Sequence, residues 1–214
     1  MLHPMDITLQ KSCPTVMVPR FGELAPLETT GERLLIAANG VFLEVSRPWL
    51  RLVRRVGRFD IKTAVPYGTA AAATDLRCGK IPAHLIGEFA EMARAAMPNE
   101  TGGWIVWNSA TGAFQLVPVT ILSHGRDHLD YDRPALADGE VLVVDCHSHG
   151  KFPAGFSPTD NKDDQHDVKF AFVMGNCLAA TPSLCLRLCA KGIFEAVDRV
   201  PGNWYAAARA REVV

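Results

Sequence analysis

The chain has 214 residues, a formal net charge of −1 at pH 7 and 48 % hydrophobic residues. This composition is that of an ordinary globular protein, long enough for one or two domains with a real core. The near-neutral charge gives no attraction to nucleic acid, and no apolar run reaches the length of a membrane helix. We therefore expect neither nucleic acid nor a membrane among its partners.

The N-terminus and the cysteines indicate the compartment. The first residues lack the basic start and apolar core of a signal peptide. The six cysteines are scattered and form no CxxC pair. A chain of this size does not need disulfides for stability. The sequence thus predicts reduced thiols and a cytoplasmic location.

Residues 1–80 are predicted to form a β-rich N-terminal region whose role the sequence does not assign. Residues 1–30 show little periodicity and are expected to be irregular, apart from a short strand at Thr15–Val18. Two β-rich runs follow within residues 33–45, and the Asn39-Gly40 dipeptide between them is a strong hairpin signal.

The basic residues of this region allow two interpretations. Residues 46–56 alternate like another strand, and five arginines lie between Arg47 and Arg58. We interpret them as a solvated face of a β-meander, with a docking surface for an acidic partner as the alternative. Prolines and glycines then interrupt residues 65–82, which predicts a connection and a domain boundary near residue 80.

The second predicted domain, residues 81–214, begins with the clearest helix of the chain. Apolar residues recur at helical spacing over residues 82–97, between two prolines. Residues 101–108 and 113–122 are predicted to be two strands of a hairpin. Residues 123–140 form a polar loop of a length typical of functional or mobile segments, and the family resemblance given below implies that it acts as a mobile lid. Its His124 and His128 are expected to be solvated rather than metal ligands.

The stretch from Val141 to Asp160 carries the chemistry. Its apolar start, Val141–Asp145, predicts a buried strand. His147 and His149 follow, and on an extended chain they point to the same face because they are two residues apart. Ser157, a following proline and Asp160 form a helix-start signature. Two imidazoles and one carboxylate are ligands that zinc accepts, and three protein ligands leave one position open for water.

Each part of this stretch also has a reading without chemistry. The histidines alone are typical of a polar strand end, and Ser157 with Asp160 is typical of a plain capping box. Cys146 is a possible thiolate ligand, but on a strand it faces away from His147, so we place it in the core.

The remaining residues complete an α+β (mixed α/β) pattern. The helix capped by Ser157 is predicted to run through residues 161–175 and to carry His166 on its surface. A final hairpin follows at residues 183–200, and the tail is predicted to be a short helix or a frayed end. The element order predicts a curved, largely antiparallel sheet flanked by helices.

The spacing His-Ser-His-x7-Ser-x-x-Asp, from His147 to Asp160, resembles the motif of the JAMM (MPN+, Mov34/PAD-1-like) zinc metalloproteases at every defined position. Glu100, in the segment MPNETGGWIVW, resembles the upstream glutamate of that family. The resemblance covers roughly residues 82–200 and implies the cytidine-deaminase-like JAMM fold. The layout of the whole chain is also similar to the JAMM-containing protein A subfamily of bacterial PRTRC cassettes.

The resemblance implies a mechanism and partners. His147, His149 and Asp160 would bind Zn²⁺, Glu100 would act as general base, and Ser157 would stabilise the oxyanion. The implied substrate is a peptide or isopeptide bond at the C-terminus of a ubiquitin-like protein or sulfur carrier, and a ThiF/E1-like enzyme is an implied partner. The alternatives are a catalytically silent zinc-binding scaffold and a different zinc amide hydrolase, although the Pro-Cys-x-x-Cys signature of zinc deaminases is absent.

Overall fold

The computed structural model describes residues 2–61 and 64–209. The chain divides into two compact units, Met1–Gly79 and Lys80–Val214, and each is described by itself. Within the described residues no helix combines the length and the apolar composition that a membrane span requires.

In its described part, the first unit is a five-stranded sheet with one short helix. Its elements are α1 (Pro4–Ser12), β1 (Thr15–Met17), β2 (Gly31–Ala37), β3 (Gly40–Arg47), β4 (Leu50–Gly57) and β5 (Ala73–Leu76). The strands follow chain order across the sheet, and all neighbours are antiparallel except β1 and β2. The expected strand near Thr15 and the hairpin around Asn39 are therefore confirmed.

Two expectations for this unit are wrong. Residues 4–12 are helical rather than irregular; Pro4 starts α1, and the His3 Nδ1 atom accepts the Met5 N–H at 3.2 Å. The apparent connection after residue 65 contains β5, which pairs with β4. Proline at the first helical position was a usable signal for α1, whereas β5 depends on its pairing with β4.

The arginines of the sheet are only partly solvated. The Glu44 side chain is fully buried and accepts hydrogen bonds from Arg33 Nε at 2.6 Å and from Arg51 Nε at 2.8 Å. Burial raises the pKa of Glu44, but hydrogen bonds from the Leu27 backbone N–H and from the two arginines outweigh that effect and hold the pKa below its ordinary value. Arg55 and Arg58 are exposed as expected, so the solvated face is smaller than the sequence predicts.

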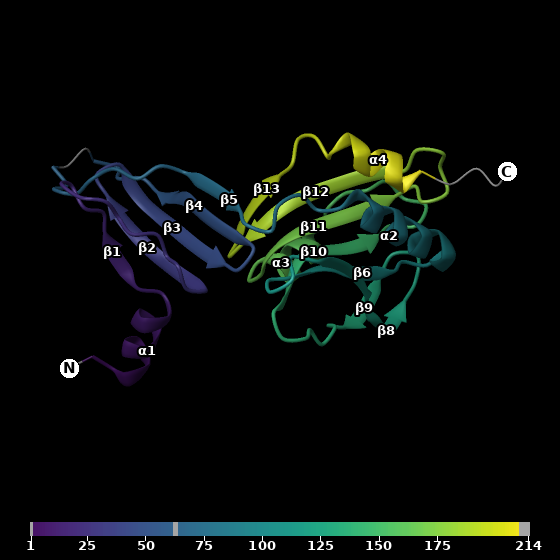
Figure 1. Ribbon diagram of the computed structural model, residues 1–214, viewed down its shortest axis with the longest axis horizontal. Helices are drawn as coiled ribbons and strands as arrows, with labels where there is room; N and C mark the ends of the chain where they lie inside the picture. The colour runs from purple at the N-terminus through teal and green to yellow at the C-terminus, as the bar shows by residue number, and fades with distance from the viewer. Residues whose placement is uncertain (1, 62–63, 210–214) are drawn as a thin grey trace. The chain divides into compact units, whose positions relative to one another are not determined.

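In its described part, the second unit is a six-stranded sheet with a separate hairpin and three helices. Its elements are α2 (Ala83–Ala96), β6 (Gly102–Asn108), β7 (Phe114–Pro118), β8 (Thr120–His124), β9 (Leu129–Asp132), β10 (Glu140–Ser148), α3 (Pro158–Asp164), β11 (Val168–Gly175), β12 (Ser183–Ala190), β13 (Ile193–Ala196) and α4 (Gly202–Ala208). The sheet order is β13-β12-β11-β10-β6-β7, and only β10 and β11 are parallel. The predicted mixed α/β class, with a largely antiparallel sheet, is confirmed (Figure 1).

Three predicted elements of this unit are corrected. The helix that begins after Ser157 ends at Asp164, and residues 168–175 form β11. A capping box indicates where a helix begins but not where it ends, and a short apolar run fits a buried strand equally well. Residues 113–122 divide into β7 and β8, which belong to different sheets. The expected lid, residues 123–140, contains β9, which pairs with β8.

One face of the six-stranded sheet is apolar and covered by helices. Cys146 on β10 and Phe172 on β11 are neighbours in register on this face, and both are fully buried. The Phe172 ring makes edge-to-face contacts with Phe89 of α2, at 6.0 Å between ring centroids, and with Trp204 of α4, at 5.6 Å. Figure 1 shows α2 and α4 side by side. The core of the second unit therefore lies between these helices and the sheet.

The opposite face of the same sheet is polar. Because side chains alternate along a strand, Asp145 and His147 of β10 face away from Cys146. Lys169 of β11 and Arg187 of β12 are on this polar face as well, by the register of the ladders. The sheet thus separates an apolar core from a face that carries charged side chains and His147.

We expect Phe172→Ala to destabilise the protein by about 3–5 kcal/mol, because it removes the ring that joins both helices to the sheet and leaves a cavity. Urea denaturation followed by tryptophan fluorescence measures this loss. The same substitution at Phe21, whose side chain is 96 % exposed, is the matched control and should change stability little. Equal stability of the two variants would contradict the assigned core.

Candidate metal centre

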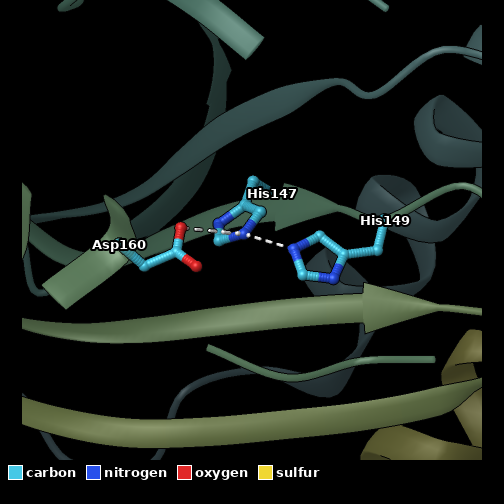
Figure 2. A group of neighbouring side chains, drawn as sticks. All are labelled: His147, His149 and Asp160. Atoms are coloured by element: carbon cyan, nitrogen blue, oxygen red, sulfur yellow. Dashed lines mark hydrogen bonds and ion pairs between the residues drawn. The ribbon is translucent and has the colours of Figure 1, made fainter. Parts of the chain in front are cut away.

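Three side chains with metal-binding atoms converge where β10 ends. His147 lies on β10, His149 follows its last residue, and Asp160 lies in the first turn of α3. One ligand atom from each lies within 4.8 Å of the other two. Figure 2 shows His147 between Asp160 and His149. The structure therefore brings together the three side chains that the sequence predicts as ligands.

The spacing of these atoms suits a small tetrahedral ion. The two Nε2 atoms of His147 and His149 are 3.1 Å apart, and the His147 Nε2 atom is 3.5 Å from the Asp160 Oδ1 atom. Bonds of about 2.0 Å to a tetrahedral ion place neighbouring ligand atoms about 3.3 Å apart. Both distances are close to that value, and the ligand atoms of His149 and Asp160 lie within 4.8 Å of each other, so the three atoms can converge on one ion.

The backbone keeps both histidines on the polar face. β10 pairs with β11 up to Ser148, and the His149 N–H then donates to the Met174 carbonyl at 2.8 Å. The chain is therefore still paired with β11 at His149. Cys146 points to the opposite face, is fully buried, and has a pKa raised well above its ordinary value by burial. The structure places Cys146 in the core and not among the ligands.

The His149 ring is oriented by a backbone carbonyl. Its Nδ1–H donates to the Pro153 carbonyl at 3.3 Å, which leaves the Nε2 lone pair directed toward His147. The loop that carries Pro153 packs directly on Gly175 of β11. A Cβ atom at Gly175 would lie 2.2 Å from the Ala154 nitrogen. Glycine is required there for this loop to reach His149.

Asp160 divides its two carboxylate oxygens between two tasks. The Oδ2 atom accepts the Ser157 backbone N–H at 2.6 Å, while the Asp160 N–H donates to Ser157 Oγ at 3.1 Å, forming a capping box. The Oδ1 atom faces His147. Burial raises the pKa of Asp160, but His147 and the Ser157 hydrogen bonds outweigh it and hold the pKa below its ordinary value. The carboxylate is thus ionised and fixed in place.

Burial lowers the pKa of His147, and His149 acts in the same direction, whereas Asp160 raises it. The net effect is a pKa below the ordinary value for histidine. Neutral imidazole is the form that binds metals, so the surroundings of His147 favour the ligand form near neutral pH.

Glu100 enters the site from the strand next to β10. It lies two residues before β6, in which Gly102 is the register partner of His147. A Cβ atom at Gly102 would lie only 3.0 Å from the Leu129 side chain, so glycine allows the hairpin to approach this strand closely. Ser148, the middle residue of the His-x-His motif, fixes this segment because it exchanges hydrogen bonds with Thr101 at 3.0 Å.

The β8–β9 hairpin fixes the Glu100 backbone from the other side. The Glu100 N–H donates to the Gly125 carbonyl at 2.7 Å, and the Glu100 carbonyl accepts from His124 Nδ1 at 2.7 Å. His124 is therefore not a solvated loop residue, as the sequence led us to expect, but a support for Glu100. His128 is exposed and lies 3.2 Å from the Ser123 hydroxyl, and His166 is exposed after the end of α3.

A cavity of about 530 Å³ joins these groups, and the side chains predicted to carry the chemistry all line it: Glu100, His147, His149, Ser157 and Asp160. Burial raises the pKa of Glu100 to about 7, and repulsion from Asp160 and Asp127 acts in the same direction. A carboxylate with such a pKa exchanges a proton readily near neutral pH. Because Ser157 Oγ accepts the Asp160 N–H, its own hydroxyl proton is left to donate into the cavity.

Sequence reasoning missed two supports of Glu100, Ser148 and His124, and a buried lysine, Lys169. Ser148 stood inside the motif, but nothing in the motif indicates its partner. Lys169 had a usable signal, because a lysine within the apolar run of residues 168–174 must find buried partners. The signal was hidden by the assignment of this run to a helix.

The raised pKa of Glu100 has a consequence for stability. Between about pH 4.5 and 7 the folded protein retains a proton that the unfolded chain releases, so stability falls as the pH rises through this range. We expect Glu100→Gln to stabilise the metal-free protein at pH 8 by roughly 1–3 kcal/mol, with little effect below pH 4.5. Urea denaturation at both pH values, with the exposed Glu88→Gln as control, measures the difference; equal effects of the two substitutions would contradict it.

Comparison with known proteins identifies the family of each part of the chain. Residues 3–77 match a domain of unknown function, DUF2016, and residues 82–189, about half of the chain, match the prokaryotic homologs of the JAB domain. No curated protein matches the chain. Among solved structures, protein DSY2949 from Desulfitobacterium hafniense aligns with a TM-score of 0.42 and 18 % identity, over 53 % of this chain and 85 % of that one. The chain belongs to the prokaryotic JAB-domain family, within the JAMM/MPN proteins, and carries a DUF2016 domain before its JAB domain.

Proposed function

We propose that the protein is a zinc-dependent hydrolase that cleaves a peptide or isopeptide bond. One observation carries the proposal: the ligand set His147, His149 and Asp160 shares a single cavity with Glu100 and Ser157. The JAB domain supports the proposal because zinc isopeptidases are common among JAMM-type domains. A capped helix beside two surface histidines does not account for a buried glutamate in the same cavity.

The donor set is suited to catalysis rather than to a closed structural site. Two neutral imidazoles and one carboxylate leave a net charge of +1 with Zn²⁺, and three protein ligands leave one coordination position open. When bound, zinc supplies Lewis acidity, which polarises a carbonyl group and acidifies water.

Glu100 and Ser157 have the complementary roles. The Glu100 carboxylate accepts a proton from the attacking water and delivers it to the nitrogen of the leaving amine, as general base and then general acid. The Ser157 hydroxyl donates a hydrogen bond to the oxygen that becomes negatively charged as the carbonyl is attacked. Its cap on α3 keeps the hydroxyl in place without taking its proton.

For the substrate we propose the C-terminal tail of a ubiquitin-like protein or sulfur carrier. JAB-family membership supports this class, and a ThiF/E1-like enzyme that activates such carriers is the proposed functional partner. The β8–β9 hairpin borders the cavity through Leu129 and Tyr131, and an extended tail can pair with the edge of such a hairpin.

Metal content is the first prediction. We expect purified protein to contain close to one zinc per chain by elemental analysis, and His149→Ala to lose it, because two remaining ligands bind zinc weakly. Substitution of the exposed His166 by alanine is the matched control and should leave the zinc content unchanged. Absence of zinc in the wild type, also after its addition at neutral pH, would refute the proposed function.

Cleavage is the second prediction. The substrate for the test is a ubiquitin-like sulfur carrier with a C-terminal peptide extension. Glu100→Gln should retain zinc but lower the cleavage rate by about 10²–10⁴-fold, since it removes the proton acceptor. Ser157→Ala should lower the rate by about 10²–10³-fold, whereas Ser157→Thr, which keeps a hydroxyl and a helix cap, should restore most of it.

The same assay separates the alternatives. Zinc without turnover on any extended carrier would favour the catalytically silent scaffold. Release of ammonia from small amides, with extended carriers left intact, would favour a different zinc amide hydrolase. If Glu100→Gln cleaved the extended carrier at the wild-type rate, Glu100 would have no role in the mechanism.

A further inference from the structure

The helix that carries Asp160, α3, is held in place by ion pairs between side chains rather than by apolar packing. α3 has seven residues, and its one buried residue is Asp164. A helix this short has little stability of its own in water. The position of Asp160 relative to the two histidines must therefore depend on what anchors Asp164.

Asp164 is bound by two cations from the polar face of the sheet. Its Oδ1 atom lies 2.8 Å from Lys169 Nζ, and its Oδ2 atom accepts a hydrogen bond from Arg187 Nη2 at 2.7 Å. Arg187 also donates to Asn161 of α3, and its guanidinium group stacks on the Phe156 ring at 3.9 Å. The side chains of Asp164, Lys169 and Arg187 are each at most 8 % exposed.

Lys169 extends this anchor to the strand that carries the histidines. Its ammonium group lies 2.6 Å from Asp145 Oδ2, so one buried cation bridges a carboxylate on β10 and a carboxylate on α3. Asp167 approaches the same ammonium at 3.3 Å. Burial lowers the pKa of Lys169, but the carboxylates outweigh it and raise the pKa above its ordinary value, so the bridge is charged.

The periodicities of the two elements place this bridge beside the metal ligands. Asp145 precedes His147 by two residues and shares its face of β10, while Asp164 follows Asp160 by four residues and shares its face of α3. We propose that Asp145, Lys169, Asp164 and Arg187 form an ionic strut that positions Asp160 against His147 and His149, and so sets the affinity of the metal centre. This inference rests on the proposed function.

The strut acts through position and not through contact with the ion. The metal-facing oxygen of Asp160 must lie near the two imidazole nitrogens, and groups that orient ligands typically contribute 10–100-fold to metal affinity. If Asp164 loses its charge, Arg187 and Lys169 no longer hold the end of α3, and Asp160 can move away although no ligand has changed.

The test measures Co²⁺ binding to the metal-free protein by competition with a chelating indicator, together with the visible absorption spectrum of the bound ion. We expect Asp164→Asn to weaken binding by about 10–100-fold and to shift the spectrum toward that of Asp160→Asn. Asp138→Asn is the control, with the same charge change at an exposed position outside the cavity; it should bind Co²⁺ as tightly as the wild type.

Asp164→Glu is the second variant in case Asp164→Asn does not fold. It keeps every ion pair charged but displaces the carboxylate by about one carbon–carbon bond, so it should fold and still bind Co²⁺ roughly tenfold more weakly. If a folded Asp164 variant bound Co²⁺ with the affinity and spectrum of the wild type, the ionic strut would be refuted, while the proposed function would stand. An equal loss in Asp138→Asn would also overturn the strut, because net charge would then explain the effect. A wild type that binds no metal would overturn the proposed function itself.

Discussion

The alternation of side chains along β10 is the constraint on which the second unit depends. At the paired end of this strand, Cys146 enters the apolar core, while Asp145 and His147 face the polar side. A shift of one residue would bury the metal-binding side chains and expose the core. The parallel partner β11 fixes the register, and the His149 N–H extends the pairing to the second histidine. The pairing of β10 with β11 therefore determines which side chains enter the core and which line the site.

The polar face of the sheet has a desolvation cost, from its buried charges, that the apolar face does not have. Buried charges must be paired, and even then their desolvation can cancel the gain from pairing. Lys169 and Arg187 meet that requirement with carboxylates from β10 and α3. A closed apolar layer would stabilise the sheet as well, but it would leave no fixed carboxylate near the histidines. The network is best understood as a device for position rather than for stability.

Backbone hydrogen bonds hold Glu100, the proposed general base, in a buried position. Its backbone is fixed by Gly125 and His124 of the hairpin and, through Thr101, by Ser148 of β10. These bonds hold the carboxylate in a buried position, which raises its pKa to about 7. Burial disfavours the ionised carboxylate, and the resulting pKa near neutrality is the property that the proposed proton transfer requires.

The sequence by itself predicted the fold class and the three candidate ligands. His147, His149 and Asp160 lie close together in the chain, at the end of one strand and the start of one helix, so their joint spacing and its resemblance to the JAMM motif predicted them, whereas periodicity and capping alone also fitted a plain capped helix beside two surface histidines. Only the tertiary structure decided that residues 168–175 form a strand, and that His124 and Lys169 support the site. Their partners are distant in the chain, and burial or exposure of such residues depends on strand pairing, which no local pattern encodes.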